Sequence, residues 1–320
     1  MKKNTAKFTE SLELQVAIPE DTETYDRRIK SYSIHALKTA AVVDKIYVQH
    51  TQFSKVIAGM ERVFQIAPEF DVPHGMILIG LPGTGKTAAF QYFQGTLPSS
   101  SLFASGDGAV GLRCPKRPRV GHFVAALLKA YRYPFVNGSA QQMYMRRGIL
   151  FDAIRQKGTR LIFIDESQNM LRSRYASSSH DGDTEVSEFF REMVDVCKVA
   201  LVLAGSEELD AVTGADTALA SRLTVRETLS NIELGSQWMA TLHAFVRQSP
   251  NFELNGVEDP RLAMLLHRAT QGNLRSLKRL LIEAILIAVD SNLNNVDCAV
   301  FGQAFGLVFG SAHAQPNVFI

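Results

Sequence analysis

One stretch of eight residues constrains the fold of this chain more than any other. Residues 80–87 read Gly-Leu-Pro-Gly-Thr-Gly-Lys-Thr, directly after an apolar run at 76–80 and directly before a helical pattern at 85–95. Glycines let such a loop fold around a phosphate and point its N–H groups inward, and the following helix adds the positive end of its dipole. The pattern predicts a strand, a phosphate-binding loop and a helix in direct succession.

The same loop predicts which nucleotide groups are bound. Lys86 is expected to reach the β- and γ-phosphates of ATP, and the hydroxyl of Thr87 to bind Mg²⁺. The loop residues that we expect to contact the nucleotide are Gly80, Pro82, Gly83, Thr84, Gly85, Lys86 and Thr87.

A second motif ends another apolar run. Residues 161–166 read Leu-Ile-Phe-Ile-Asp-Glu, so two carboxylates follow a buried strand, at the sheet edge where ligands bind in open α/β folds. Asp165 is expected to contact the nucleotide and hold Mg²⁺ through water, and Glu166 to act as general base on the attacking water. An acid after a strand can also be only a helix cap. The phosphate-binding loop about 80 residues earlier favours ATP hydrolysis.

The rest of the pattern predicts an α/β fold with two parts. Short apolar runs at 76–80, 109–114, 160–165 and 199–205 alternate with amphipathic stretches, which indicates a parallel sheet covered by helices. After about residue 232 only helical patterns follow. We therefore expect an N-terminal helical extension (1–45), a nucleotide-binding core (46–232), a helical lid (233–309) and a flexible C-terminal tail (310–320).

Three further residues are candidates for the nucleotide site. Ser206 would sense the γ-phosphate if the strand at 199–205 lies between the other two, and is otherwise part of an ordinary strand-to-loop turn. Arg222 lies in a stretch that projects into the neighbouring subunit's site in many ring ATPases, with Arg226 as second choice; a surface salt bridge is the alternative. Arg275, at the start of a helix in the second part, would reach back to the phosphates from the lid; the alternative is that it only lies at a solvated helix end.

Composition and charge limit the classes of partner and the cellular location that we expect. The formal net charge is only +2, so affinity for nucleic acid has to come from local basic clusters. The three cysteines form no CxxC pair, which favours reduced thiols in a cytosolic protein. The N-terminus lacks the apolar stretch of a signal peptide, and no apolar run approaches the roughly 20 residues that span a bilayer. We expect a cytoplasmic protein with no membrane partner.

In this order the elements resemble the AAA+ superfamily: Walker A, Walker B, sensor 1, arginine finger, and a helical lid with sensor 2. Within it the chain is similar to the TniB/TnsC group of transposition ATPases. The similarity lies in QHTQFSKVIAGMERVF before the first strand, in LIFIDESQNML and in VALVLAGSEEL, and extends over roughly residues 45–310. Ser206 departs from the family pattern, because sensor 1 is often Thr or Asn.

The resemblance implies an AAA+ P-loop ATPase core, with a parallel sheet flanked by helices, followed by a small all-helical lid. It implies an ATP-dependent regulator of DNA transposition that assembles on double-stranded DNA as a ring or filament of identical subunits. Such a regulator links a TniQ-like target-selection protein to the transposase; in CRISPR-associated transposons, TniQ sits on an RNA-guided complex. A replication-type loader or initiator, and a nucleotide-switched protein scaffold with slow hydrolysis, are the alternatives.

Two basic clusters are candidates for contacting DNA. Facing the hole of a ring, they would follow the phosphate backbone without reading bases, whereas the alternative is ordinary solvated charge. Arg172 and Arg174, in the polar stretch 172–183 that we expect to be an exposed loop, are weaker candidates. The main candidates are Lys116, Arg117 and Arg119, which follow Arg113 in one loop, and Arg146 and Arg147 on the helix before Walker B.

Overall fold

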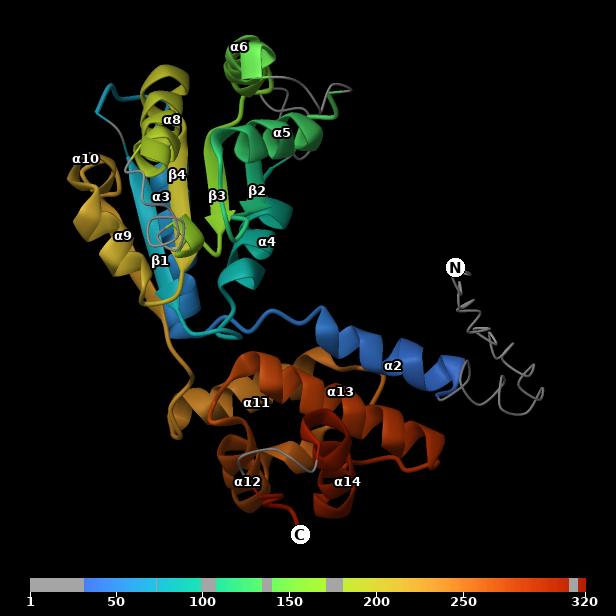
Figure 1. The fold of residues 1–320 in the computed structure, drawn as a ribbon. Coiled ribbons are helices and arrows are strands. Elements are labelled where there is room, and N and C mark those ends of the chain that lie inside the picture. Colours follow the sequence, from blue (N-terminus) through green and yellow to red (C-terminus); the bar gives the residue numbers. More distant parts are fainter. Residues whose placement is uncertain (1–31, 73, 99–107, 134–139, 171–180, 311–315) are drawn as a thin grey trace, which may run out of the picture.

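A parallel five-stranded sheet forms the core of the first part of the chain (Figure 1). The computed structural model describes residues 32–72, 74–98, 108–133, 140–170, 181–310 and 316–320. The strands pair in the order β2-β3-β4-β1-β5, and every pairing is parallel. They are β1 (Gly75–Gly80), β2 (Ala109–Arg113), β3 (Leu161–Asp165), β4 (Ala200–Gly205) and β5 (Val225–Leu229). The predicted α/β class with a parallel sheet is confirmed.

The central strands are apolar on both faces because helices cover both. All six residues of β1 and of β4 are buried. One face packs against α3 (Thr51–Ile66) and α4 (Lys86–Thr96). The other packs against α5 (Val120–Ala130), α6 (Ala140–Gln156) and α8 (Asp181–Cys197). The short helices α9 (Leu209–Ala215) and α10 (Thr217–Ala220) connect β4 to β5.

Two elements differ from the sequence-based expectation. The edge strand β5 was not predicted, because Arg226 and Glu227 interrupt its apolar pattern and only Leu229 is fully buried. Helix α8 already begins at Asp181, so the end of the stretch expected as a loop (172–183) is helical. Residues 171–180, with Arg172 and Arg174, lie outside the described part of the chain.

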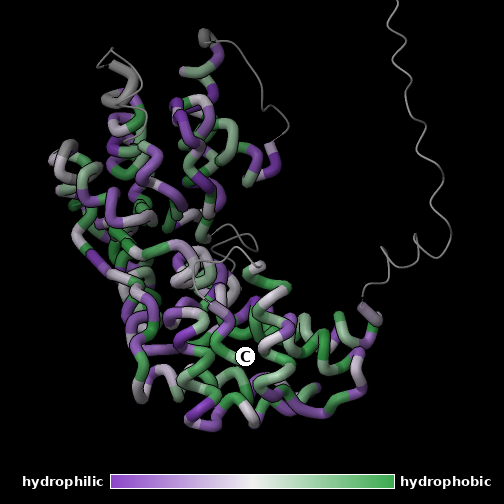
Figure 2. The backbone as a smooth tube through the Cα atoms, turned by 60° about the horizontal axis from the view of Figure 1, so that its bottom comes forward, coloured by the Kyte–Doolittle hydropathy of each residue, from purple (hydrophilic) through white to green (hydrophobic). Residues whose placement is uncertain are grey.

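In the described residues after β5, the regular elements are all helices. They enclose a second apolar core, with Trp238 fully buried, and this part is rich in apolar segments in Figure 2. Among the described residues, no helix is long and apolar enough to cross a membrane. The elements are α11 (Ser236–Gln248), η1 (Asn255–Glu258), α12 (Pro260–Thr270), α13 (Leu274–Asp290) and α14 (Cys298–Phe309).

Both ends of the described chain pack on this helical part. Helix α2 (Ile34–Asp44) lies along α13 and places Ala36, Ala40 and Val43 in its core (Figure 1). At the other end, the side-chain amide of Asn317 donates to the carbonyl of Gly302 on α14 at 2.8 Å, and the Phe319 ring stacks on Phe301. Residues 316–320 thus differ from the flexible tail expected for 310–320, because Phe319 finds an apolar partner on α14.

Candidate nucleotide-binding site

The glycine-rich loop joins β1 to α4 in the form that phosphate binding requires. Gly83 and Gly85 have φ angles of 88° and 106°, a left-handed backbone that favours glycine. Between them, the buried hydroxyl of Thr84 donates to the carbonyl of Leu81 at 2.9 Å and fixes the turn. The loop leads directly into the N-terminus of α4. The first N–H groups of a helix have no partner within the helix and can bind an anion.

Lys86 places its ammonium group back over this loop. Its Nζ donates to the carbonyls of Gly80 and Leu81, at 2.5 and 3.1 Å. Burial lowers the pKa of Lys86, and the nearby carboxylates of Asp165 and Glu166 act in the opposite direction. A half-buried cation held by backbone carbonyls is suited to binding phosphate oxygens in their place.

A hydrogen bond joins the loop to the second motif. The hydroxyl of Thr87 donates to Oδ2 of Asp165 at 2.6 Å, and Oδ1 of Asp165 accepts from the backbone N–H of Glu166 at 2.9 Å. The two side chains thus present a hydroxyl and a carboxylate oxygen at one point of the sheet edge. Oxygen donors of this kind are those that Mg²⁺ prefers.

Glu166 follows β3 in a left-handed conformation, with a φ angle of 56°, which is uncommon for a residue other than glycine. Its Oε2 accepts from the side-chain amide of Gln168 at 2.7 Å, and its Oε1 lies 3.7 Å from the guanidinium of Arg113. The Gln168 oxygen accepts in turn from the backbone N–H of Ser206 at 3.2 Å. Strand β4 does lie between β1 and β3, so the condition set for Ser206 is met.

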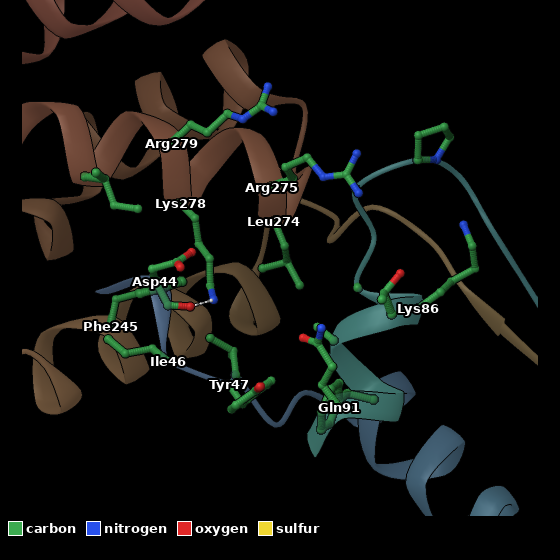
Figure 3. Close-up of a pocket in the computed structure, with 18 of the residues that line it drawn as sticks. Asp44, Ile46, Tyr47, Lys86, Gln91, Phe245, Leu274, Arg275, Lys278 and Arg279 are labelled. Carbon is green, nitrogen blue, oxygen red and sulfur yellow. Dashed lines mark hydrogen bonds between the residues drawn. The ribbon is translucent and has the colours of Figure 1, made fainter. Parts of the chain in front are cut away.

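The lid touches the phosphate-binding loop directly. The backbone N–H of Arg275 donates to the carbonyl of Gly83 at 3.2 Å, and the side-chain amide of Asn273 donates to the carbonyl of Pro82 at 3.0 Å. Asn273 also caps α13, because its oxygen accepts from the N–H of Ser276. The N-terminal end of α13 therefore lies over the loop, and the Arg275 side chain extends toward it (Figure 3).

A cavity of about 500 Å³ lies between the loop, α13 and the segment that joins α2 to α3. One end is lined by Lys86, Thr87, Asp165 and Glu166, and an apolar lining comes from Ile46, Tyr47, Val48 and Phe53.

The sequence did not single out Lys278, although it lies one turn from Arg275 on the same helix. The Nζ of Lys278 donates to the Asp44 carbonyl at 2.7 Å (Figure 3). The same atom lies 5.8 Å from the centre of the Tyr47 ring, and burial lowers the pKa of Lys278.

The two candidate finger arginines lie away from the lining of this cavity. Arg222 forms a two-point ion pair with Asp195 on α8, with N–O distances of 2.9 and 2.6 Å, and donates to the carbonyl of Ala218 at 2.7 Å. The hydrogen bonds to Asp195 raise the pKa of Arg222. Arg226, on the edge strand, pairs with Asp210. Within one subunit, then, Arg222 makes the salt bridge that was its alternative interpretation.

The basic clusters occupy two different environments. Lys116, Arg117 and Arg119 are exposed on the loop between β2 and α5. Arg113, the last residue of β2, lies beside Glu166. Arg147 instead lies in the contact between α6 and α8. There it pairs with Glu192, and its guanidinium lies 5.7 Å from the ring centres of both Phe151 and Phe189. Its neighbour Arg146 is partly exposed on α6. The loop is thus the more accessible of the two clusters.

Several solved structures share this fold. The ORC1 protein of Aeropyrum pernix, in complex with DNA, matches with a TM-score of 0.61 and 19% identity, over 84% of this chain and 69% of that one. The ORC2 protein of Aeropyrum pernix, in ADPNP–ADP complexes, matches with a TM-score of 0.63 and 14% identity, over 86% and 72%. At these identities the likeness concerns the fold alone, which is that of AAA+ ATPases.

Two sequence comparisons agree with the fold. An "AAA ATPase forming ring-shaped complexes" from Bifidobacterium longum is 25% identical over 147 residues, which are 44% of this chain and 27% of that protein. The chain thus spans about a quarter of the length of this curated relative. The family described as "Bacterial TniB protein" matches residues 38–231, more than half of the chain. The chain therefore belongs to the bacterial TniB family, and it has the AAA+ P-loop fold, a parallel sheet followed by a helical part.

Proposed function

We propose that this chain hydrolyses Mg²⁺-bound ATP to ADP and phosphate, and that hydrolysis controls its assembly on duplex DNA. The observation that carries the first part is the hydrogen bond from Thr87 to Asp165, which places the phosphate-binding loop beside two carboxylates. The loop N–H groups and Lys86 bind the phosphates, and Arg275 approaches them from the lid. Ser206, which follows the end of β4, would contact the γ-phosphate. The adenine base of ATP binds against the apolar lining at Ile46 and Val48.

The residues at the sheet edge fit a divalent cation and a hydrolytic water. Thr87 and Asp165 would hold Mg²⁺, which neutralises charge on the phosphate oxygens when bound. Glu166 orients a water molecule and accepts its proton as the water oxygen bonds to the γ-phosphorus. The bond from this phosphorus to the bridging β,γ-oxygen breaks, and ADP leaves with that oxygen.

Two variants separate binding from hydrolysis. In Lys86→Ala, ATP affinity should fall by about 10- to 100-fold, because a charge-assisted contact to the phosphates is lost. In Glu166→Gln, affinity should be unchanged and the single-turnover rate should fall by about 10²- to 10⁴-fold, the usual contribution of a general base. Titration with a non-hydrolysable analogue and quench-flow hydrolysis measure both. Wild-type affinity in Lys86→Ala would contradict the binding site, and normal turnover in Glu166→Gln would contradict the base.

We further propose that subunits assemble so that Arg222 completes the site of a neighbour. Two observations support this proposal. Arg222 is not among the residues that line the cavity of its own subunit, and the chain is similar to the ring-forming relative named above. Arg222 would exchange Asp195 for the transferring phosphoryl group, whose charge an arginine stabilises.

Mixed assemblies test this proposal. Arg222→Ala subunits alone should hydrolyse ATP slowly. If Arg222 contributes as much as the arginine fingers of GTPases, their hydrolysis rate should fall by about 10³-fold or more. Adding Lys86→Ala subunits should restore part of the activity, because some interfaces then pair an intact cavity with an intact arginine. The control adds Lys86→Ala/Arg222→Ala subunits, which should restore nothing. No recovery at any mixing ratio with the single variant would leave Arg222 as a residue of the Asp195 ion pair.

For the partner, we propose double-stranded DNA bound through the β2–α5 loop. Its exposed residues Lys116, Arg117 and Arg119 concentrate positive charge in a chain whose net charge is only +2. One subunit offers few phosphate contacts, so ATP-dependent assembly would multiply them along the duplex. In this role the protein would link a TniQ-like target-selection protein to a transposase.

A salt titration of duplex binding tests the loop. Each phosphate neutralised adds about −0.9 to the slope of log affinity against log salt, so replacing Lys116, Arg117 and Arg119 by Ala should flatten it by up to about 3. The matched control replaces three exposed cations elsewhere by Ala, namely Lys38, Lys55 and Arg62. Equal slopes for wild type and the loop variant would show that this loop does not contact DNA. If wild type shows no ATP-dependent duplex binding, the scaffold alternative is favoured.

A further inference from the structure

Three consecutive buried polar residues follow the Walker B carboxylates. The backbone N–H of Ser167 donates to the carbonyl of Ala204 in β4, and its hydroxyl donates to the carbonyl of Ile164. The side-chain amide of Asn169 donates to the carbonyl of Cys114, just after β2. Gln168, between them, is only 7% exposed. The turn after β3 is thus tied to the strands on both sides of it.

Gln168 uses both ends of its amide, and its orientation is determined by a backbone group. The N–H of Ser206 can only donate, so the Gln168 oxygen must face it, at 3.2 Å. The amide nitrogen then faces Oε2 of Glu166, at 2.7 Å. A glutamate in this place would offer an acceptor at both ends and would bring a second carboxylate against Glu166.

The end of β4 is shaped to admit this side chain. A Cβ atom on Gly205 would lie 2.5 Å from the Gln168 oxygen, so a larger residue there would displace the amide. Glu166 has another partner in Arg113, but at 3.7 Å and with the arginine side chain 77% exposed. Solvent weakens such a contact. The hydrogen bond from Gln168 is the shorter and more buried of the two restraints on the Glu166 carboxylate.

We infer that Gln168 is a positioning residue for ATP hydrolysis, which holds the Glu166 carboxylate with one end of its amide and the end of β4 with the other. The inference rests on the proposed role of Glu166 as the base. Because Ser206 lies at the far end of the same amide, a shift of Ser206 on contact with the γ-phosphate would move Glu166 too. Base placement would then depend on the presence of the γ-phosphate.

Two substitutions separate positioning from packing. Gln168→Met keeps the length of the side chain and loses both hydrogen bonds. Gln168→Glu keeps an acceptor for Ser206 but repels Glu166. The single-turnover rate is measured with duplex DNA and Mg²⁺. It should fall by about 10- to 100-fold in Gln168→Met, because one hydrogen bond to a charged group is lost. It should fall further in Gln168→Glu. Affinity for a non-hydrolysable ATP analogue should stay near that of wild type in both variants, and the melting temperature should stay near that of wild type in Gln168→Met.

Gln52→Met is the matched control. Gln52 also uses both ends of its amide, donating to the Ser230 hydroxyl and accepting from the Ser230 N–H, but Ser230 lies just after β5. It should hydrolyse ATP at the wild-type rate. A rate in Gln168→Glu equal to or above that in Gln168→Met would overturn the inference, as would wild-type rates in both or an equal loss of ATP affinity. Normal turnover in Glu166→Gln would instead reject the proposed base itself.

Discussion

The hydrogen bond between Thr87 and Asp165 is the contact on which the site depends. It joins residues 78 positions apart at 2.6 Å, and it forms because of the order of the strands. In the order β2-β3-β4-β1-β5, the phosphate-binding loop and the two carboxylates leave the sheet at the same edge, on either side of β4. Because Gly205 at the end of β4 has no side chain, the side chain of Gln168 fits between them, next to Ser206.

The cavity is also shared between two apolar cores. One side is lined by the phosphate-binding loop, α4 and the end of β3, whereas α13 lies on the other side and contacts the loop through the N–H of Arg275 and the Gly83 carbonyl. The segment that follows α2 lines it as well, and Lys278 ties that segment to α13 through the Asp44 carbonyl. A nucleotide bound here would therefore contact the sheet, the helical part and the N-terminal connection together, which is the arrangement expected if ATP controls the relative placement of these parts.

The parts of the fold that could be predicted are those that a local pattern specifies. Strands β1, β3 and β4 are continuous apolar runs, and glycines or carboxylates mark their ends. Strand β5 could not be predicted, because its charged residues are tolerated only at a sheet edge. Gln168 and Lys278 were missed for a related reason: their partners, Ser206 and the Asp44 carbonyl, are distant in sequence. The pairing of Arg222 with Asp195 likewise depends on how α8 packs.

We propose that Thr87 and Asp165 form the cation-binding side of an ATP site. Titration of a non-hydrolysable ATP analogue into wild type and Thr87→Ala, each with and without Mg²⁺, tests this proposal. Mg²⁺ should increase the affinity of wild type, and most of this increase should be lost in Thr87→Ala, while the affinities without Mg²⁺ stay similar. An equal Mg²⁺-dependent increase in both proteins would contradict the claim.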